Sequence, residues 1–187
     1  MDVQVKRWTR DEYERLAQAG VLGEDDRVQL IAGELVQMGP QGASHAAAIS
    51  AVADALRGLF GKGNHVRVQL PLALGPDSEP EPDVAVVEGS WHDYRDEHPV
   101  RALLVVEVAE SSGSFDRERK GPVYAAAGIP EYWVIDLTAA AVDVFRDPGH
   151  DQGGHPHYET RLRLKSPDTL TAVAGPGRSI IVGDLLP

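Results

Sequence analysis

A carboxylate inside an apolar run is the feature that most limits how this chain folds. Residues 103–109 (LLVVEVA) are apolar except for Glu107. Such a run is typical of a central strand that is covered on both faces of its sheet. Because side chains alternate along a strand, Glu107 should share one face with Leu103, Val105 and Ala109. A buried carboxylate is costly unless it is compensated. We therefore expect Glu107 to be paired, protonated, bound to a metal ion or located at the strand end.

The surrounding residues 102–137 read as strand, turn, helix, turn and strand. This unit is long enough for a helical crossover between two neighbouring strands. Other patterns predict a capped helix over residues 9–19 and a hairpin over 27–38. They also predict a second helix over 44–60, which Ser44 can cap, and an alternating strand over 65–74. With two or three helices and about eight strands, the chain fits a mixed α/β or α+β fold.

Composition limits the class of protein. The 187 residues fit one domain spanning 1–187, and the absence of cysteine excludes disulfides and thiolate metal sites. No run is apolar enough for a membrane helix and no signal peptide is readable, so we expect a cytoplasmic protein without a membrane partner. The net charge of −11 is unlike that of a general nucleic-acid binder. A protein of this composition that acts on nucleic acid must concentrate positive charge locally or obtain it from metal ions.

Asp83 is the candidate partner of Glu107. It follows Pro82 and opens the apolar segment 83–87 (DVAVV). If the two strands pair side by side, both carboxylates can reach one point, which suits Mg²⁺ or Mn²⁺ because these ions prefer oxygen ligands. The carbonyl of Val108 is a candidate third ligand. The alternatives are a turn or cap role for Asp83, and for Glu107 an ion pair with a core arginine.

Lys120 is the candidate cation. Asp116, Lys120 and Tyr124 recur at a spacing of four residues, so they should share one helix face. Near a bound phosphate, a lysine can orient the attacking water or stabilise the charge of the transition state. From spacing alone, a solvent-exposed ion pair between Asp116 and Lys120 is favoured over this catalytic role.

These residues resemble the motif of a known family. Pro82-Asp83, Glu107-Val108, Lys120 and the segment 124–136 (YAAAGIPEYWVID) are similar to the Uma-two family of restriction endonucleases, in the PD-(D/E)XK nuclease superfamily. The resemblance implies a central mixed sheet flanked by helices, with aspartate and glutamate on adjacent strands binding metal. It also implies DNA as the substrate and a homodimer, since duplex cleavage needs one site for each strand.

One departure from the superfamily pattern concerns the lysine, which is expected two residues after the glutamate. That position is Ala109, and Lys120 on the following helix is its candidate replacement.

Three further residues are candidate auxiliary members of the site. Glu34 is a further acidic ligand, His45 a phosphate contact or proton carrier, and Gln69 a residue that orients a ligand. The structural alternative for His45 is a histidine whose hydrogen bonds are satisfied at the start of a helix. The alternative for Gln69 is a position on a solvated strand face.

The sequence leaves three functions open. The first is a DNA endonuclease that uses Asp83, Glu107 and Lys120. The second is a catalytically inactive binding or structural module on the same fold, which the acidic charge and Ala109 favour. The third is a phosphodiesterase acting on RNA or on a small nucleotide.

Overall fold

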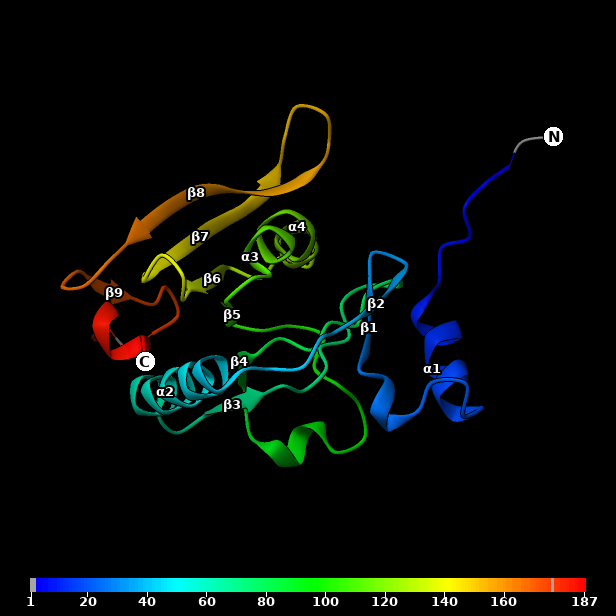
Figure 1. Cartoon of the computed structure of the whole chain (residues 1–187), viewed down its shortest axis with the longest axis horizontal. Coiled ribbons are helices and arrows are strands. Elements are labelled where there is room, and N and C mark those ends of the chain that lie inside the picture. Colours follow the sequence, from blue (N-terminus) through cyan, green and yellow to red (C-terminus); the bar gives the residue numbers. More distant parts are fainter. Residues whose placement is uncertain (1–2, 176) are drawn as a thin grey trace.

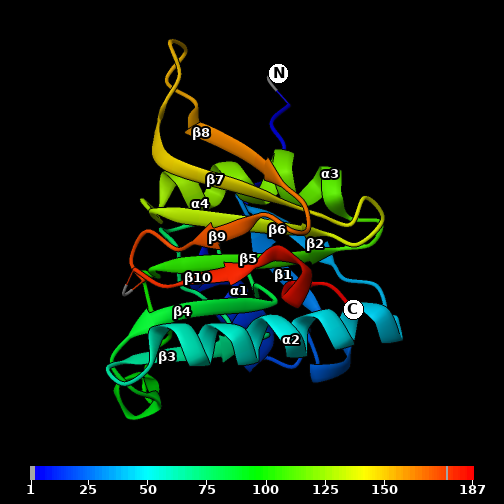
Figure 2. The ribbon, with the colours of Figure 1, turned by 90° about the vertical axis from the view of Figure 1, so that its left-hand side faces the viewer.

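A six-stranded mixed sheet forms the centre of the computed structural model, which describes residues 3–175 and 177–187. The strand order is β3-β4-β5-β6-β7-β8. Strands β5 and β6 run parallel, and the other neighbours in this sheet are antiparallel. Two smaller two-stranded sheets, β1-β2 and β9-β10, accompany it (Figures 1 and 2). The predicted mixed sheet flanked by helices is therefore confirmed.

The elements follow one another along the chain in this way. The first half contains α1 (Arg10–Gln18), η1 (Glu24–Asp26), β1 (Val28–Ile31), β2 (Glu34–Gln37), α2 (Ala43–Phe60), β3 (Asn64–Val68), β4 (Val84–Glu88) and η2 (Trp91–Tyr94). The second half contains β5 (Leu104–Ala109), α3 (Gly113–Phe115), η3 (Asp116–Lys120), α4 (Gly121–Ala126), β6 (Glu131–Asp136), β7 (Ala141–His150), β8 (Pro156–Leu164), β9 (Thr169–Thr171), β10 (Ser179–Ile181) and η4 (Val182–Leu185).

Each face of the sheet has its own apolar core. On one face, α2 and the C-terminal segment with β9, β10 and η4 pack against Leu104, Val106 and Val108 of β5 (Figure 2). On the other face, Val105 and Ala109 belong to a second core with residues of α4, β4 and β6. All six residues of β5 are buried. The predicted alternation is confirmed from Leu104 to Ala109 and places Glu107 on the side of α4. Leu103, which was predicted to share the face of Glu107, lies before the strand and packs against the other core.

The N-cap of helix α2 lies two residues before the one that we predict from the sequence. Its N-cap is Gly42 rather than Ser44, so His45 lies in the first turn of the helix. The buried residues of α2, among them Val52, Ala53 and Leu56, follow the predicted helical spacing.

No helix in the described ranges is long and apolar enough to span a bilayer.

The strand predicted for residues 65–74 is shorter in the structure. Strand β3 ends at Val68 because Gln69 adopts a positive φ of 51° and Pro71 follows two residues later. The expected alternation fails beyond this point. Leu70 is 42% exposed, and Leu72 packs in the core on the opposite face from Val66. Strand β3 is the first strand of the sheet, so it lies at the sheet's edge.

A wide helical turn connects β5 to β6. Residues Asp116–Lys120 form a π-helical turn, in which the backbone N–H of Gly121 donates to the carbonyl of Asp116. The next residue, Pro122, has no N–H with which to continue a regular α-helical pattern. The resulting turn is of the kind often found at functional sites. It places Asp116 and Lys120 in the interior, with exposed fractions of 2% and 1%.

Candidate active site

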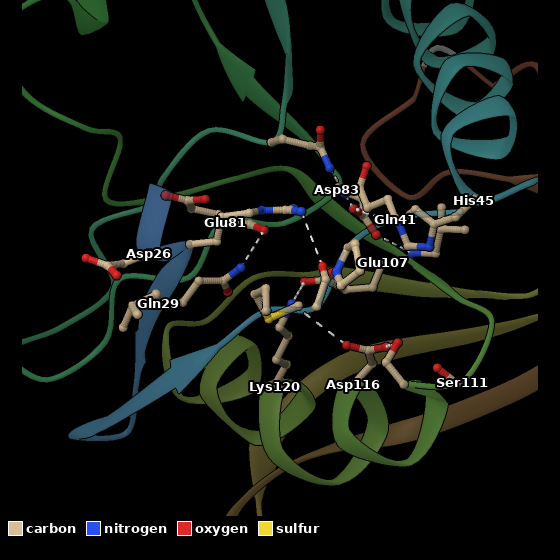
Figure 3. A pocket seen from close by; sticks show the side chains of 18 of the residues that line it. Asp26, Gln29, Gln41, His45, Glu81, Asp83, Glu107, Ser111, Asp116 and Lys120 are labelled. Carbon is tan, nitrogen blue, oxygen red and sulfur yellow. Dashed lines mark hydrogen bonds and ion pairs between the residues drawn. The ribbon is translucent and has the colours of Figure 1, made fainter. Parts of the chain in front are cut away.

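A cleft of about 880 Å³ opens where the β1–β2 hairpin and the start of α2 meet β4, β5 and η3 (Figure 3). Asp83, Glu107, Asp116 and Lys120 line it. These residues come from three separate chain segments. The sheet brings the first two together, and the helical crossover adds the others.

Asp83 lies immediately before β4, and Val84 of that strand pairs with Val106 of β5. This antiparallel register sets Asp83 beside Glu107, as the sequence prediction required. The carboxylate is held in place by the backbone, because the N–H of Val108 donates to Oδ2 at 2.8 Å. Asp83 is 7% exposed. Its orientation into the cleft is thus fixed by β5 itself.

Glu107 is compensated by a lysine and a tyrosine. Its Oε1 accepts hydrogen bonds from Lys120 Nζ at 2.9 Å and from the Tyr124 hydroxyl at 2.6 Å. Burial is the main reason that the pKa of Glu107 is raised to about 8; Asp116 and Asp83 act in the same direction, and Lys120 acts against them. In the described part of the chain Oε2 has no hydrogen-bond donor. Glu107 therefore has one oxygen engaged and one available to the cleft.

Lys120 is surrounded by carboxylates and not by solvent. Its ammonium lies 2.9 Å from Glu107 Oε1 and 3.8 Å from Asp116 Oδ1. Burial lowers the pKa of Lys120, but Glu107 and Asp116 raise it more, so it stays above its usual value. The exposed ion pair that spacing alone favoured is wrong, because the π-turn and α4 direct the lysine inward.

Two of the predicted auxiliary residues also contact Asp83. His45 Nε2 lies 3.3 Å from Asp83 Oδ1, and Gln69 Nε2 donates to the same oxygen at 3.4 Å. The hydrogen bond to Asp83 raises the pKa of His45, although burial acts in the opposite direction. Gln69 reaches the site because β3 ends just before it. Gln69 lies past the end of β3 and not on a strand face, but it is exposed as predicted while it contacts Asp83.

Glu34 is placed elsewhere. It pairs with Arg7 and Arg119 on the outer side of the β1–β2 hairpin and is not among the residues that line the cleft. Both arginines neutralise it, and they lower its pKa. An exposed strand end with two cations within reach makes a surface ion cluster the better description of Glu34.

Asp116 and Tyr124 are site residues that the sequence prediction did not include. The Ser112 hydroxyl donates to Asp116 Oδ2 at 2.6 Å, and burial raises the pKa of this carboxyl despite the nearby Lys120. The spacing of four residues with Lys120 was the available signal. Spacing alone favours a surface ion pair, because nothing local in the sequence reveals that this turn is buried.

The donor set fits a divalent metal ion that retains water. Asp83 and Glu107 supply carboxylate oxygens on adjacent strands, and Val108 also lines the cleft. In the described ranges no three His, Cys, Asp or Glu side chains form a ready metal cage. This pattern is that of Mg²⁺, which commonly uses one or two carboxylates and completes its shell with water and phosphate.

The comparisons with known proteins agree with this architecture. A crystal structure described as a putative nuclease belonging to DUF820, from Anabaena variabilis ATCC 29413, superposes with a TM-score of 0.71 at 18% sequence identity. The match covers 95% of this chain and 97% of that one, so the two share a fold. Among curated proteins, none matches this chain.

The fold is thus that of a nuclease-like protein with an acidic cleft. The family model Uma2, described as "Putative restriction endonuclease", matches residues 10–182. The chain belongs to this family.

Proposed function

We propose that this protein is a Mg²⁺- or Mn²⁺-dependent endonuclease that hydrolyses phosphodiester bonds in DNA. The observation that carries the proposal is the convergence of Asp83, Glu107 and Lys120 in one cleft. Carboxylates on adjacent strands, with a buried ammonium beside them, suit phosphoryl transfer. Family membership and the shared fold support the same reaction class.

In this reaction a water oxygen forms a bond to phosphorus and one ester P–O bond breaks. Asp83, Glu107 and the carbonyl of Val108 would hold the metal ion. When bound, the ion supplies Lewis-acid stabilisation of the phosphoryl oxygens and lowers the pKa of its water. The water gives up a proton as it attacks, and the departing oxygen gains one.

The protein side chains have distinct roles in this scheme. The Lys120 ammonium stabilises the negative charge that develops on the phosphoryl group. The Tyr124 hydroxyl holds Oε1 of Glu107, the same oxygen that accepts a hydrogen bond from Lys120. Gln69 and the Val108 N–H orient Asp83. His45 lies beside Asp83, where a proton carrier is useful for the leaving oxygen.

The experiment is a plasmid cleavage assay with Mg²⁺, Mn²⁺ or EDTA. We expect cleavage with either ion, none in EDTA, and loss of cleavage in Asp83→Ala and Glu107→Ala. Glu88→Ala is the matched control, since Glu88 is an exposed carboxylate at the far end of β4, the strand that Asp83 precedes. Cleavage that survives both site substitutions would overturn the proposed site.

Two further outcomes decide between the alternatives. Cleavage of RNA or of a small nucleotide, without DNA cleavage, would replace the substrate class but keep the site. A folded protein that binds no divalent ion and cuts nothing would indicate an inactive module.

We also propose a homodimer, because cutting both strands of a duplex requires two sites. Sedimentation with and without DNA tests this oligomeric state.

A further inference from the structure

Gln29 is an unusual residue of the cleft. It lies on β1, is 4% exposed, and lines the end of the cleft formed by the hairpin (Figure 3). Its Nε2 donates weakly to the backbone carbonyl of Glu81 at 3.4 Å. Its Oε1 is buried and has no hydrogen-bond partner in the described part of the chain. An unsatisfied buried acceptor is costly, so a native one calls for an explanation.

The orientation of this amide is determined by its neighbour. If the oxygen and nitrogen of Gln29 were exchanged, two oxygens would face each other across the contact to the Glu81 carbonyl. The nitrogen must therefore face Glu81. The side chain consequently offers an acceptor, not a donor, as its unused group.

The surroundings of Gln29 determine which part of a nucleic acid can bind there. The carboxylates of Asp26 and Glu81 line the same end of the cleft (Figure 3). A phosphate would be repelled by these carboxylates, whereas a neutral base with N–H groups finds several acceptors. Arg27 and Met38, which also line the cleft, offer a guanidinium plane and a thioether against which a base can pack.

The separation from the scissile site is also suitable. Glu81 precedes Asp83 by two residues, so their backbones are at most about 7 Å apart. That is a distance which one nucleotide spans. A phosphate beside Asp83 thus leaves the base of an adjacent nucleotide near Gln29.

We propose that Gln29 forms a nucleobase subsite that prefers bases carrying an exocyclic amino group at one position beside the cut. This inference rests on the proposed nuclease function and adds base selectivity to it. Adenine, cytosine and guanine carry such an amine, and thymine does not. The amine donates to Gln29 Oε1 and satisfies the buried acceptor.

The first test maps the ends produced by cleavage of mixed-sequence DNA, single-stranded and duplex. The wild-type protein should cut about three- to ten-fold faster when the base at one fixed position beside the cut carries an amine, the range of one neutral hydrogen bond. Replacing adenine by purine, which lacks only the amine, should cause the same loss. Equal rates for all four bases would overturn the subsite.

Variants separate recognition from folding. Gln29→Met keeps the length of the side chain and should cut all bases at similar rates, whereas Gln29→Glu retains an acceptor and should retain the preference. Gln37→Met is the matched control, because Gln37 is exposed on the paired strand of the same hairpin and lies outside the cleft. A preference that persists in folded Gln29→Met would contradict the proposal.

A binding measurement keeps this test independent of cleavage. In NMR titrations without metal, deoxyadenosine should shift the side-chain amide signals of Gln29 more than thymidine does. If the protein cuts no substrate but shows this difference, the nuclease proposal fails and the subsite stands. If cleavage occurs and neither nucleoside shifts Gln29, the subsite fails and the nuclease proposal stands.

Discussion

Two ionic clusters share the turn η3, and they differ in how well their charges are balanced. On the cleft side, Asp83, Glu107 and Asp116 surround the single ammonium of Lys120. On the opposite side, Arg117 donates to Asp136 and Asp143 at 2.8 Å each, and Arg163 contacts the same two carboxylates. The second cluster, with Arg161 also near Asp143, has more cations than anions.

The pKa shifts follow this difference. Burial raises the pKa of Glu107 to about 8 and also raises that of Asp116. At Asp136 burial acts in the same direction, but the Ala139 N–H, Arg163 and Arg117 lower the pKa below its usual value. Similar residue types therefore serve two purposes. In the Arg117 cluster the arginines neutralise the carboxylates, and this stabilises the fold. In the cleft cluster the carboxylates outnumber the single lysine, and a metal ion can supply the missing positive charge.

The largest expected effect concerns activity in the cleft cluster. Glu107→Gln removes one anionic oxygen ligand but preserves shape, so the cleavage rate should fall by about 10³-fold or more. A plasmid nicking assay under excess Mg²⁺ measures it. Glu88→Gln on the exposed end of β4 is the control. A rate within ten-fold of wild type would show that Glu107 is not a ligand.

The largest effect on stability should come from the Arg117 cluster. Asp143 is fully buried and Asp143→Ala leaves Arg117 with one carboxylate fewer, so the free energy of unfolding should fall by about 3 kcal/mol. Urea unfolding in EDTA measures this. In the same buffer Glu107→Gln should be no less stable than wild type, because it relieves repulsion among carboxylates. The reverse ranking would contradict the assignment of the two clusters.

The pH dependence of stability should have opposite signs in the two clusters. The lowered pKa of Asp136 means that its contribution, about 1 kcal/mol, is present above pH 4 and is lost as the pH falls below the usual aspartate pKa. The destabilisation by Asp136→Asn should thus shrink between pH 6 and pH 3. The raised pKa of Glu107 acts oppositely, since its cost appears as the pH rises from about 4.5 to 8. Urea unfolding series over pH 3–8 would disprove the account if Asp136→Asn were equally destabilising throughout.

The smallest effect should be at the edge of the cleft. Gln69→Ala removes a 3.4 Å contact to Asp83, which the Val108 N–H still holds, so we expect a loss of activity of about three- to ten-fold. Initial rates at saturating metal test this. A loss as large as that of Glu107→Gln would mean that Gln69 contacts the substrate directly.

The sequence predicted the part of the site that lies on strands. Alternation along residues 103–109 correctly placed Glu107 among buried residues, and Pro82 before an apolar run placed Asp83 at a strand start. Both inferences depend on local periodicity, which a strand expresses directly. The family resemblance added the order of the motif, and the mixed sheet that it implied is confirmed by the structure.

Other parts depend on long-range packing and could not be predicted in this way. Burial of Lys120 requires the π-turn before Pro122 and the packing of α4 on the sheet. The position of Glu34 depends on Arg7 and Arg119, which are distant in sequence from each other. Gln29 gave no signal, because a glutamine in a hairpin strand is ordinary until its surroundings are known.

Direct measurement of metal binding tests the central claim. Calorimetric titration of Mn²⁺ and Mg²⁺ into the wild-type protein should show saturable binding. The double variant Asp83→Asn, Glu107→Gln should bind neither ion at this site while keeping its circular dichroism spectrum. Asp136→Asn, from the Arg117 cluster, should bind both ions as wild type does. Identical titration curves for wild type and the double variant would contradict the account.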